Sequence, residues 1–104
     1  MADDNLQRAK NETMFREVNE RVIELRDGNE VEVLCECGAA GCIESVHITL
    51  AEYESVRADP GAFVIAPGHD NAEVDRVKAQ GPDFLIVTKK GSAGDFARKH
   101  DPRG

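Results

Sequence analysis

The stretch Cys35-Glu36-Cys37-Gly38-Ala39-Ala40-Gly41-Cys42 holds all three cysteines of this 104-residue chain. Residues 30–37, which lead into it, alternate apolar and acidic side chains over most of their length, and this predicts a β-strand. The residues expected on its inner face are Val31, Val33, Cys35 and Cys37, and those on its outer face are Glu30, Glu32 and Glu36. Glycines then allow the chain to turn back into a second strand over 43–50. The sequence therefore predicts a hairpin that brings three thiols together at one end.

Composition and charge exclude several classes of function. The formal net charge is −7, from 20 acidic and 13 basic side chains, so nucleic-acid binding and docking on an anionic membrane are both disfavoured. The sequence has no run of about 18 apolar residues, and residues 1–10 lack the apolar core of a signal peptide. We therefore expect a cytoplasmic protein. An odd number of reduced cysteines then favours metal or redox chemistry over disulfides.

The cysteine cluster suggests a zinc knuckle. Structural zinc takes four thiolate or imidazole ligands in a closed tetrahedron, so one histidine has to complete the set. His69 follows Pro67-Gly68 at a predicted strand end, where a turn could aim its ring at the hairpin. A helix predicted to begin at Asp70 would also favour the negative charge of the centre. His47 is the alternative fourth ligand, although strand alternation points its side chain outward. His100 lies in the polar C-terminal segment, where a solvent-exposed histidine is expected.

One Zn²⁺ per chain is therefore expected. The predicted ligands are Cys35, Cys37, Cys42 and His69. A redox-active thiol cluster and inert buried cysteines remain as alternatives.

An amphipathic helix is predicted for residues 11–26. Its apolar residues, spaced three and four apart, are Phe15, Val18, Val22 and Leu25. We expect this face to cover a small sheet, and docking of a partner is the alternative. Residues 1–10 are polar and charged, and we expect them to be disordered.

Short elements are predicted for the rest of the chain. Thr49 and Glu52 have the spacing of a capping box and predict a helix over 50–58. Residues 62–66 read as a strand, and residues 84–88, apolar on both faces, as a central strand.

Two later segments are predicted with less regular patterns. Residues 70–80 predict a short helix, with a hairpin strand as the alternative, and residues 92–100 predict a last helical turn. The expected fold is a single zinc-stabilised α+β domain over 11–100, followed by a tail over 101–104. In it, an N-terminal helix packs on a three- to four-stranded, mostly antiparallel sheet.

Several motifs together resemble a family of short, uncharacterised bacterial proteins, largely actinobacterial. The motifs are FREVNER at 15–21, LCEC at 34–37 with Cys42, TLAEYESVR at 49–57, FVIAPGH at 63–69 and DPR at 101–103. The resemblance covers most of the chain from about Asn11 onward. It implies that the cysteines and the Pro-Gly-His turn act as one unit, and it implies no catalytic residue.

The sequence shows no pattern typical of a catalytic site, such as a glycine-rich phosphate loop or a His-Glu-x-x-His motif. Glu36 and Glu44, which lie beside the cysteines, are expected to face solvent. We therefore expect a non-enzymatic zinc-binding domain, a regulatory or adaptor module that contacts another macromolecule, in the first instance a protein. The alternative is a cytoplasmic thiol-based redox or metal sensor that uses Cys35, Cys37 and Cys42.

Overall fold

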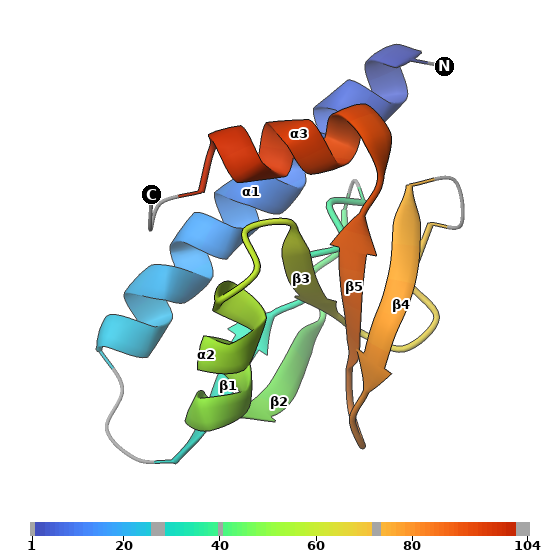
Figure 1. Ribbon diagram of the computed structural model, residues 1–104. Coiled ribbons are helices and arrows are strands. Elements are labelled where there is room, and N and C mark those ends of the chain that lie inside the picture. The colour runs from blue at the N-terminus through green and yellow to red at the C-terminus, as the bar shows by residue number, and fades with distance from the viewer. Residues whose placement is uncertain (1, 26–28, 40, 72–73, 102–104) are drawn as a thin grey trace.

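A computed structural model describes residues 2–25, 29–39, 41–71 and 74–101, which form helices and strands (Figure 1). In chain order the elements are α1 (Ala2–Glu24), β1 (Glu30–Leu34), β2 (Ser45–Thr49), α2 (Leu50–Arg57), β3 (Ala62–Ile65), β4 (Asp75–Gln80), β5 (Leu85–Lys89) and α3 (Gly91–Lys99). The strands pair antiparallel in a two-stranded and a three-stranded sheet. The α+β class is therefore confirmed, but the strands form two sheets where the sequence predicted one.

The first sheet is the predicted hairpin. Its buried cross-strand pairs are Val31 with Ile48 and Val33 with Val46. β1 ends at Leu34, so Cys35 and Cys37 lie in the loop that follows the strand. After β2, the predicted capping box opens α2, because Thr49 and Glu52 each accept a hydrogen bond from the other's backbone N–H.

In the second sheet β5 is central, as its apolar residues on both faces predicted. It pairs with β3 on one edge and with β4 on the other. β4 occupies the segment for which the sequence predicted a short helix; that prediction was wrong, and the hairpin alternative is confirmed. The Gly81 N–H donates to the Phe84 carbonyl at 2.9 Å, and a Cβ on Gly81 would lie 2.3 Å from the Phe84 ring. This close turn holds β4 against β5, whose backbone pairs with the polar backbone groups of β4.

α1 differs most from the sequence prediction. It begins at Ala2, whereas the sequence placed the helix start at Asn11 and disorder before it. Its buried face carries one residue from each successive turn: Ala9, Glu12, Arg16 and Asn19, with Ile23 partly buried. Of the four residues predicted to be buried, Val18 and Leu25 are instead 41% and 87% exposed, and Phe15 and Val22 are only partly buried. The physical reason is that the polar side chains of α1 hydrogen-bond to backbone groups beneath it, which an apolar face could not satisfy.

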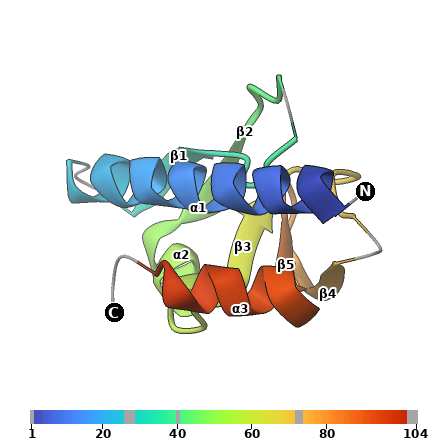
Figure 2. The ribbon, with the colours of Figure 1, turned by 90° about the horizontal axis from the view of Figure 1, so that it is seen from above.

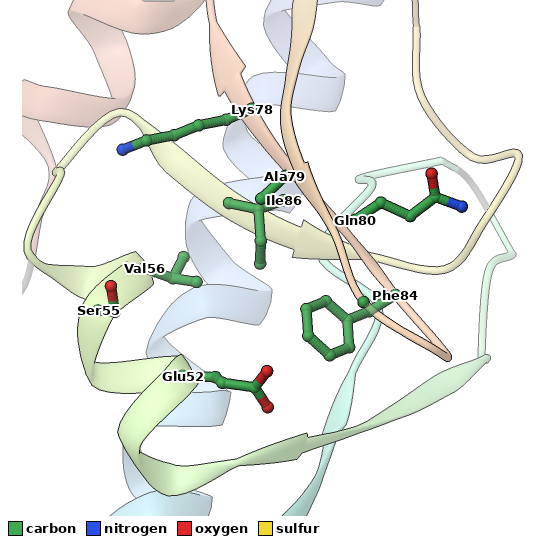
Figure 3. A pocket seen from close by; sticks show the side chains of 9 residues that line it. Glu52, Ser55, Val56, Lys78, Ala79, Gln80, Phe84 and Ile86 are labelled. Atoms are coloured by element: carbon green, nitrogen blue, oxygen red, sulfur yellow. The ribbon is translucent and has the colours of Figure 1, made fainter.

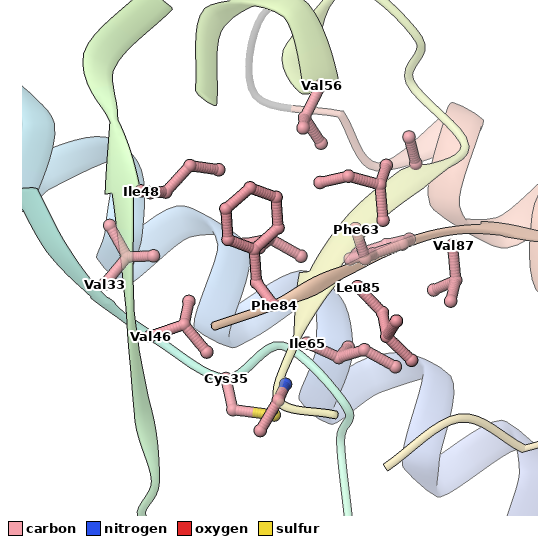
Figure 4. Close-up of a cluster of buried hydrophobic side chains, with 14 of the residues drawn as sticks. Val33, Cys35, Val46, Ile48, Val56, Phe63, Ile65, Phe84, Leu85 and Val87 are labelled. Carbon is pink, nitrogen blue, oxygen red and sulfur yellow. The ribbon is translucent and has the colours of Figure 1, made fainter. Parts of the chain in front are cut away.

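One hydrophobic core fills the space between the two sheets (Figure 4). Phe84 lies between Val33 and Ile48 of the first sheet and Phe63 of the second. Cys35 belongs to this cluster and lies at one end of it. The cysteine loop therefore closes one end of the core.

Candidate metal centre

Four side chains from two loops meet at the end of the core. Cys35 and Cys37 follow β1, Cys42 precedes β2, and His69 lies between β3 and β4. One ligand atom of each residue lies within 4.8 Å of those of the other three. His69 Nδ1 is 3.6 Å from Cys35 Sγ and 3.7 Å from Cys42 Sγ. The four residues predicted from the sequence thus lie close enough together to bind a metal ion.

Backbone geometry shapes both loops. Gly38, Gly41 and Gly68 have φ angles of 74°, 79° and 85°, in the left-handed region that favours glycine. A Cβ on Gly38 would lie 2.5 Å from the Arg8 carbonyl oxygen, so this loop packs directly on α1. The two loops also contact each other, because the Ala66 N–H donates to Cys35 Sγ at 3.1 Å. The glycines and this N–H···S bond hold the sulfur atoms near His69.

Arg8 of α1 bridges the two loops. Its Nε donates to the Cys37 carbonyl at 2.7 Å, and its Nη2 donates to the His69 carbonyl at 3.1 Å. A dication bound by three thiolates keeps a net negative charge, so the guanidinium also supplies an opposite charge nearby. The sequence assigned that role to a helix starting near Asp70, whereas the described residues there are not helical. Arg8 was missed because its segment was expected to be disordered.

The second nitrogen of the His69 ring faces a carboxylate. His69 Nε2 lies 2.7 Å from Oε2 of Glu44, which is 59% exposed. An imidazole that donates Nε2–H to a carboxylate keeps Nδ1 unprotonated and oriented for a metal. Glu44 was predicted to face solvent. The exposure of Glu44 agrees with this prediction. Its contact with His69 was not predicted, because the two residues are 25 positions apart and no sequence pattern links them.

Burial disfavours ionisation of two thiols of this cluster, Cys35 and Cys37. It raises the pKa of Cys35 from 9.0 to about 12, and it also raises the pKa of Cys37. Thiolates are the metal ligands, so a bound cation would have to displace these protons. Three sulfur donors and one imidazole suit a borderline-soft dication such as zinc.

Glu36, between two of the cysteines, is fully buried, so the prediction that it faces solvent was wrong. Its carboxylate accepts hydrogen bonds from Asn19 Nδ2 at 2.7 Å, from the Tyr53 hydroxyl at 3.2 Å and from the Val64 N–H at 3.1 Å. Burial raises its pKa, against these donors. The outer side of the loop is covered by α1 and β3, which strand alternation alone does not reveal.

The other two histidines lie outside the cluster. His47 points outward, as predicted, with its Nε2 2.9 Å from Glu32 and its Nδ1 3.8 Å from Asp83. The His100 ring lies 4.3 Å from that of Phe96. Among the described residues, His69 is therefore the histidine that joins the cysteines.

Two hollows lie elsewhere on the described surface. One, of about 290 Å³, lies between α2 and the β4–β5 hairpin, with Val56 and Phe84 inside and Glu52 at its edge (Figure 3). The other, of about 560 Å³, adjoins the cysteine loop and is lined in part by Glu44 and Pro67. None of the four predicted ligands lines either hollow.

The fold and the cluster define a small α+β domain with a Cys₃His group able to hold a metal ion at the end of its core. No family model matches the chain, and no curated protein or solved structure is found to be similar to it. In the described part of the chain, none of the helices combines the length and apolar character needed to cross a bilayer.

Proposed function

We propose that this domain binds one structural zinc ion through Cys35, Cys37, Cys42 and His69. The observation that carries the proposal is the convergence of these four donors within 4.8 Å, from the loop between β1 and β2 and the loop between β3 and β4. Four protein ligands fill a tetrahedral shell and leave no position for substrate, which is typical of structural zinc. Arg8 and Glu44 support the ligands from outside the shell.

Metal analysis of the purified full chain tests this step. We expect about one zinc per chain, lost in Cys37→Ser and in His69→Ala and kept in His47→Ala, a matched histidine outside the cluster. Replacement of zinc by Co²⁺ should give the intense absorption of a tetrahedral thiolate site. A wild-type chain that binds neither metal would rule the centre out.

We further propose that the zinc-bound domain is a non-enzymatic regulatory or adaptor module that contacts another macromolecule, a protein in the first instance. Support comes from the closed ligand set and from a sequence without catalytic motifs. The acidic charge of −7 disfavours nucleic acid.

Affinity purification of the tagged chain from its host tests the adaptor role. A specific protein should co-purify with the wild type and with His47→Ala, and not with the metal-free Cys37→Ser variant. Recovery of nucleic acid in place of protein, or of no partner at all, would contradict the proposal.

A cytoplasmic thiol sensor is the second candidate, favoured by the partial exposure of Cys42 beside the buried Cys35 and Cys37. In the reaction, two cysteine thiols lose two protons and two electrons to form one disulfide, peroxide is reduced to two waters, and any bound zinc leaves. Thiol counting and zinc release after mild peroxide treatment test this. If all three thiols and the metal persist, the sensor is excluded.

A further inference from the structure

The outer face of α1 carries an apolar stripe that the fold does not cover. Met14, Val18 and Leu25 are 51%, 41% and 87% exposed. Phe15 and Val22, on one flank of the stripe, are half-buried. We call these five residues the outer stripe. In the view from above, α1 lies uncovered along its length (Figure 2).

The face of α1 that packs against the rest of the protein is the one opposite the outer stripe. This face buries Glu12, Arg16 and Asn19, whose side chains bond to other parts of the chain. The fold therefore holds α1 largely by polar residues and leaves Met14, Val18 and Leu25 toward water. Exposed aliphatic side chains forgo part of the free energy that burial would provide, and a contiguous apolar patch of this kind is typical of an interface.

Charged residues follow the other flank of the outer stripe. They are Lys10, Glu17, Arg21 and Glu24, all exposed. None of the four side chains forms an ion pair within the described residues. Two are basic and two acidic, and their order along the helix is basic, acidic, basic, acidic.

We propose that the outer stripe of α1 binds the same stripe of a second copy of this chain, as an antiparallel helix pair with a two-fold axis at Val18. In that arrangement Met14 faces Val22 of the second copy, and Phe15 lies one residue away from the same Val22. Because the axis is perpendicular to the plane of the two helices, each flank meets its own equivalent. The apolar flank meets the apolar flank, and the charged flank meets the charged flank.

The charges agree with this register. Glu17 lies two residues, or about 3 Å along the helix, from Arg21 of the second copy and the same distance from its Glu17. Lys10 lies the same distance along the helix from Glu24 of the second copy. Each copy thus offers a basic partner for every acidic residue of the other, in four symmetric pairs. This self-complementarity identifies a second copy as the occupant, and it does not depend on the metal centre.

Sedimentation of the full chain over a range of concentrations tests the proposal. The wild type should form a dimer. Val18→Asp should raise its dissociation constant at least about tenfold, because the charge lies at the centre of the interface, while its circular dichroism stays unchanged because Val18 faces outward. Val77→Asp is the matched control: Val77 is an apolar residue 49% exposed on β4, and its variant should dimerise like the wild type.

A charge exchange tests the register. Glu17→Arg places two basic residues against each other and should weaken the dimer about fivefold. Glu17→Arg combined with Arg21→Glu should restore the wild-type dissociation constant within about twofold. A wild type that stays monomeric, a Val18→Asp variant that dimerises normally or unfolds, equal weakening by Val77→Asp, or no rescue by the exchange would each overturn the proposal.

Discussion

At the scale of single residues, His69 has two nitrogens with different partners. Nδ1 faces the sulfur atoms, while Nε2 lies 2.7 Å from Glu44. Glu44→Ala should lower zinc affinity by roughly 10–100-fold, because the ring loses the contact that fixes its orientation and proton. Titration against a competing chelator measures this. Glu32→Ala is the matched control, since Glu32 contacts His47 at 2.9 Å outside the cluster; equal affinities for the two variants would contradict the role of Glu44.

Glu12 is a second residue with a testable charge. It shares the buried Lys89 ammonium with Asp75 and lies 3.9 Å from Arg8. Burial raises the pKa of Glu12 from 4.5 to about 7, against the attraction of Lys89. The folded protein then holds a proton more tightly than the unfolded chain. The stability that this tighter proton binding by Glu12 contributes is complete below about pH 4.5 and is lost as the pH rises through about 7.

Glu12→Gln removes this titration. The free energy of unfolding of the wild type, minus that of the variant, should therefore fall between about pH 4.5 and 7, by at most about 1.4 kcal/mol per pH unit. Urea denaturation at several pH values measures it. Taking the difference cancels the contributions of groups that both proteins share. A difference that rises or stays constant over this range would show that the Glu12 pKa is not raised.

At the scale of elements, Asn19 fixes α1 to the edge of β1. Its amide donates to the Leu34 carbonyl at 2.9 Å and to Glu36, and its carbonyl accepts the Leu34 N–H at 2.8 Å. Asn19→Ala should lower the free energy of unfolding by about 3 kcal/mol, because it leaves these buried groups without partners. Val18→Ala, one position along, should change it by less than about 0.5 kcal/mol at concentrations that keep the chain monomeric. The reverse order would mean that α1 buries its apolar face.

How far the sequence could predict an element depended on what holds that element. The β1–β2 hairpin and β5 were predictable because their alternation or double-sided apolar character arises directly from burial in the core. For α1 the helical character of residues 11–24 was predictable, but its buried face was not, because an apolar period identifies a helical face but not the direction in which it points. The contacts that decide the orientation of α1 run from Arg16 to the Ala97 carbonyl and from Asn19 to the Leu34 carbonyl. Backbone carbonyls are present at every residue, so no sequence pattern marks these two as partners.

At the scale of the whole molecule, the cysteine cluster joins the first hairpin to the connection between β3 and β4. The convergence of its four residues was predictable, because clustered cysteines and a histidine after Pro-Gly carry a chemical signature in their residue types. The residues around them were not. Arg8 reaches the His69 carbonyl across 61 positions of the chain, and pairwise contacts of this kind have no local pattern.

The proposed zinc should accordingly stabilise the molecule as a whole, since it links two parts of one core. At a free zinc concentration 1,000-fold above the dissociation constant, binding contributes about 4 kcal/mol. Removing zinc with a chelator should therefore lower the Tm by roughly 15–30 °C for a domain of this size. Hydrogen exchange should rise first in the loops at 35–44 and 66–71, while the β4–β5 hairpin, which holds none of the ligands, stays protected longer. His69→Ala, which lacks one ligand, should show no Tm change with chelator, so an equal shift in both proteins would mean that the chelator acts elsewhere.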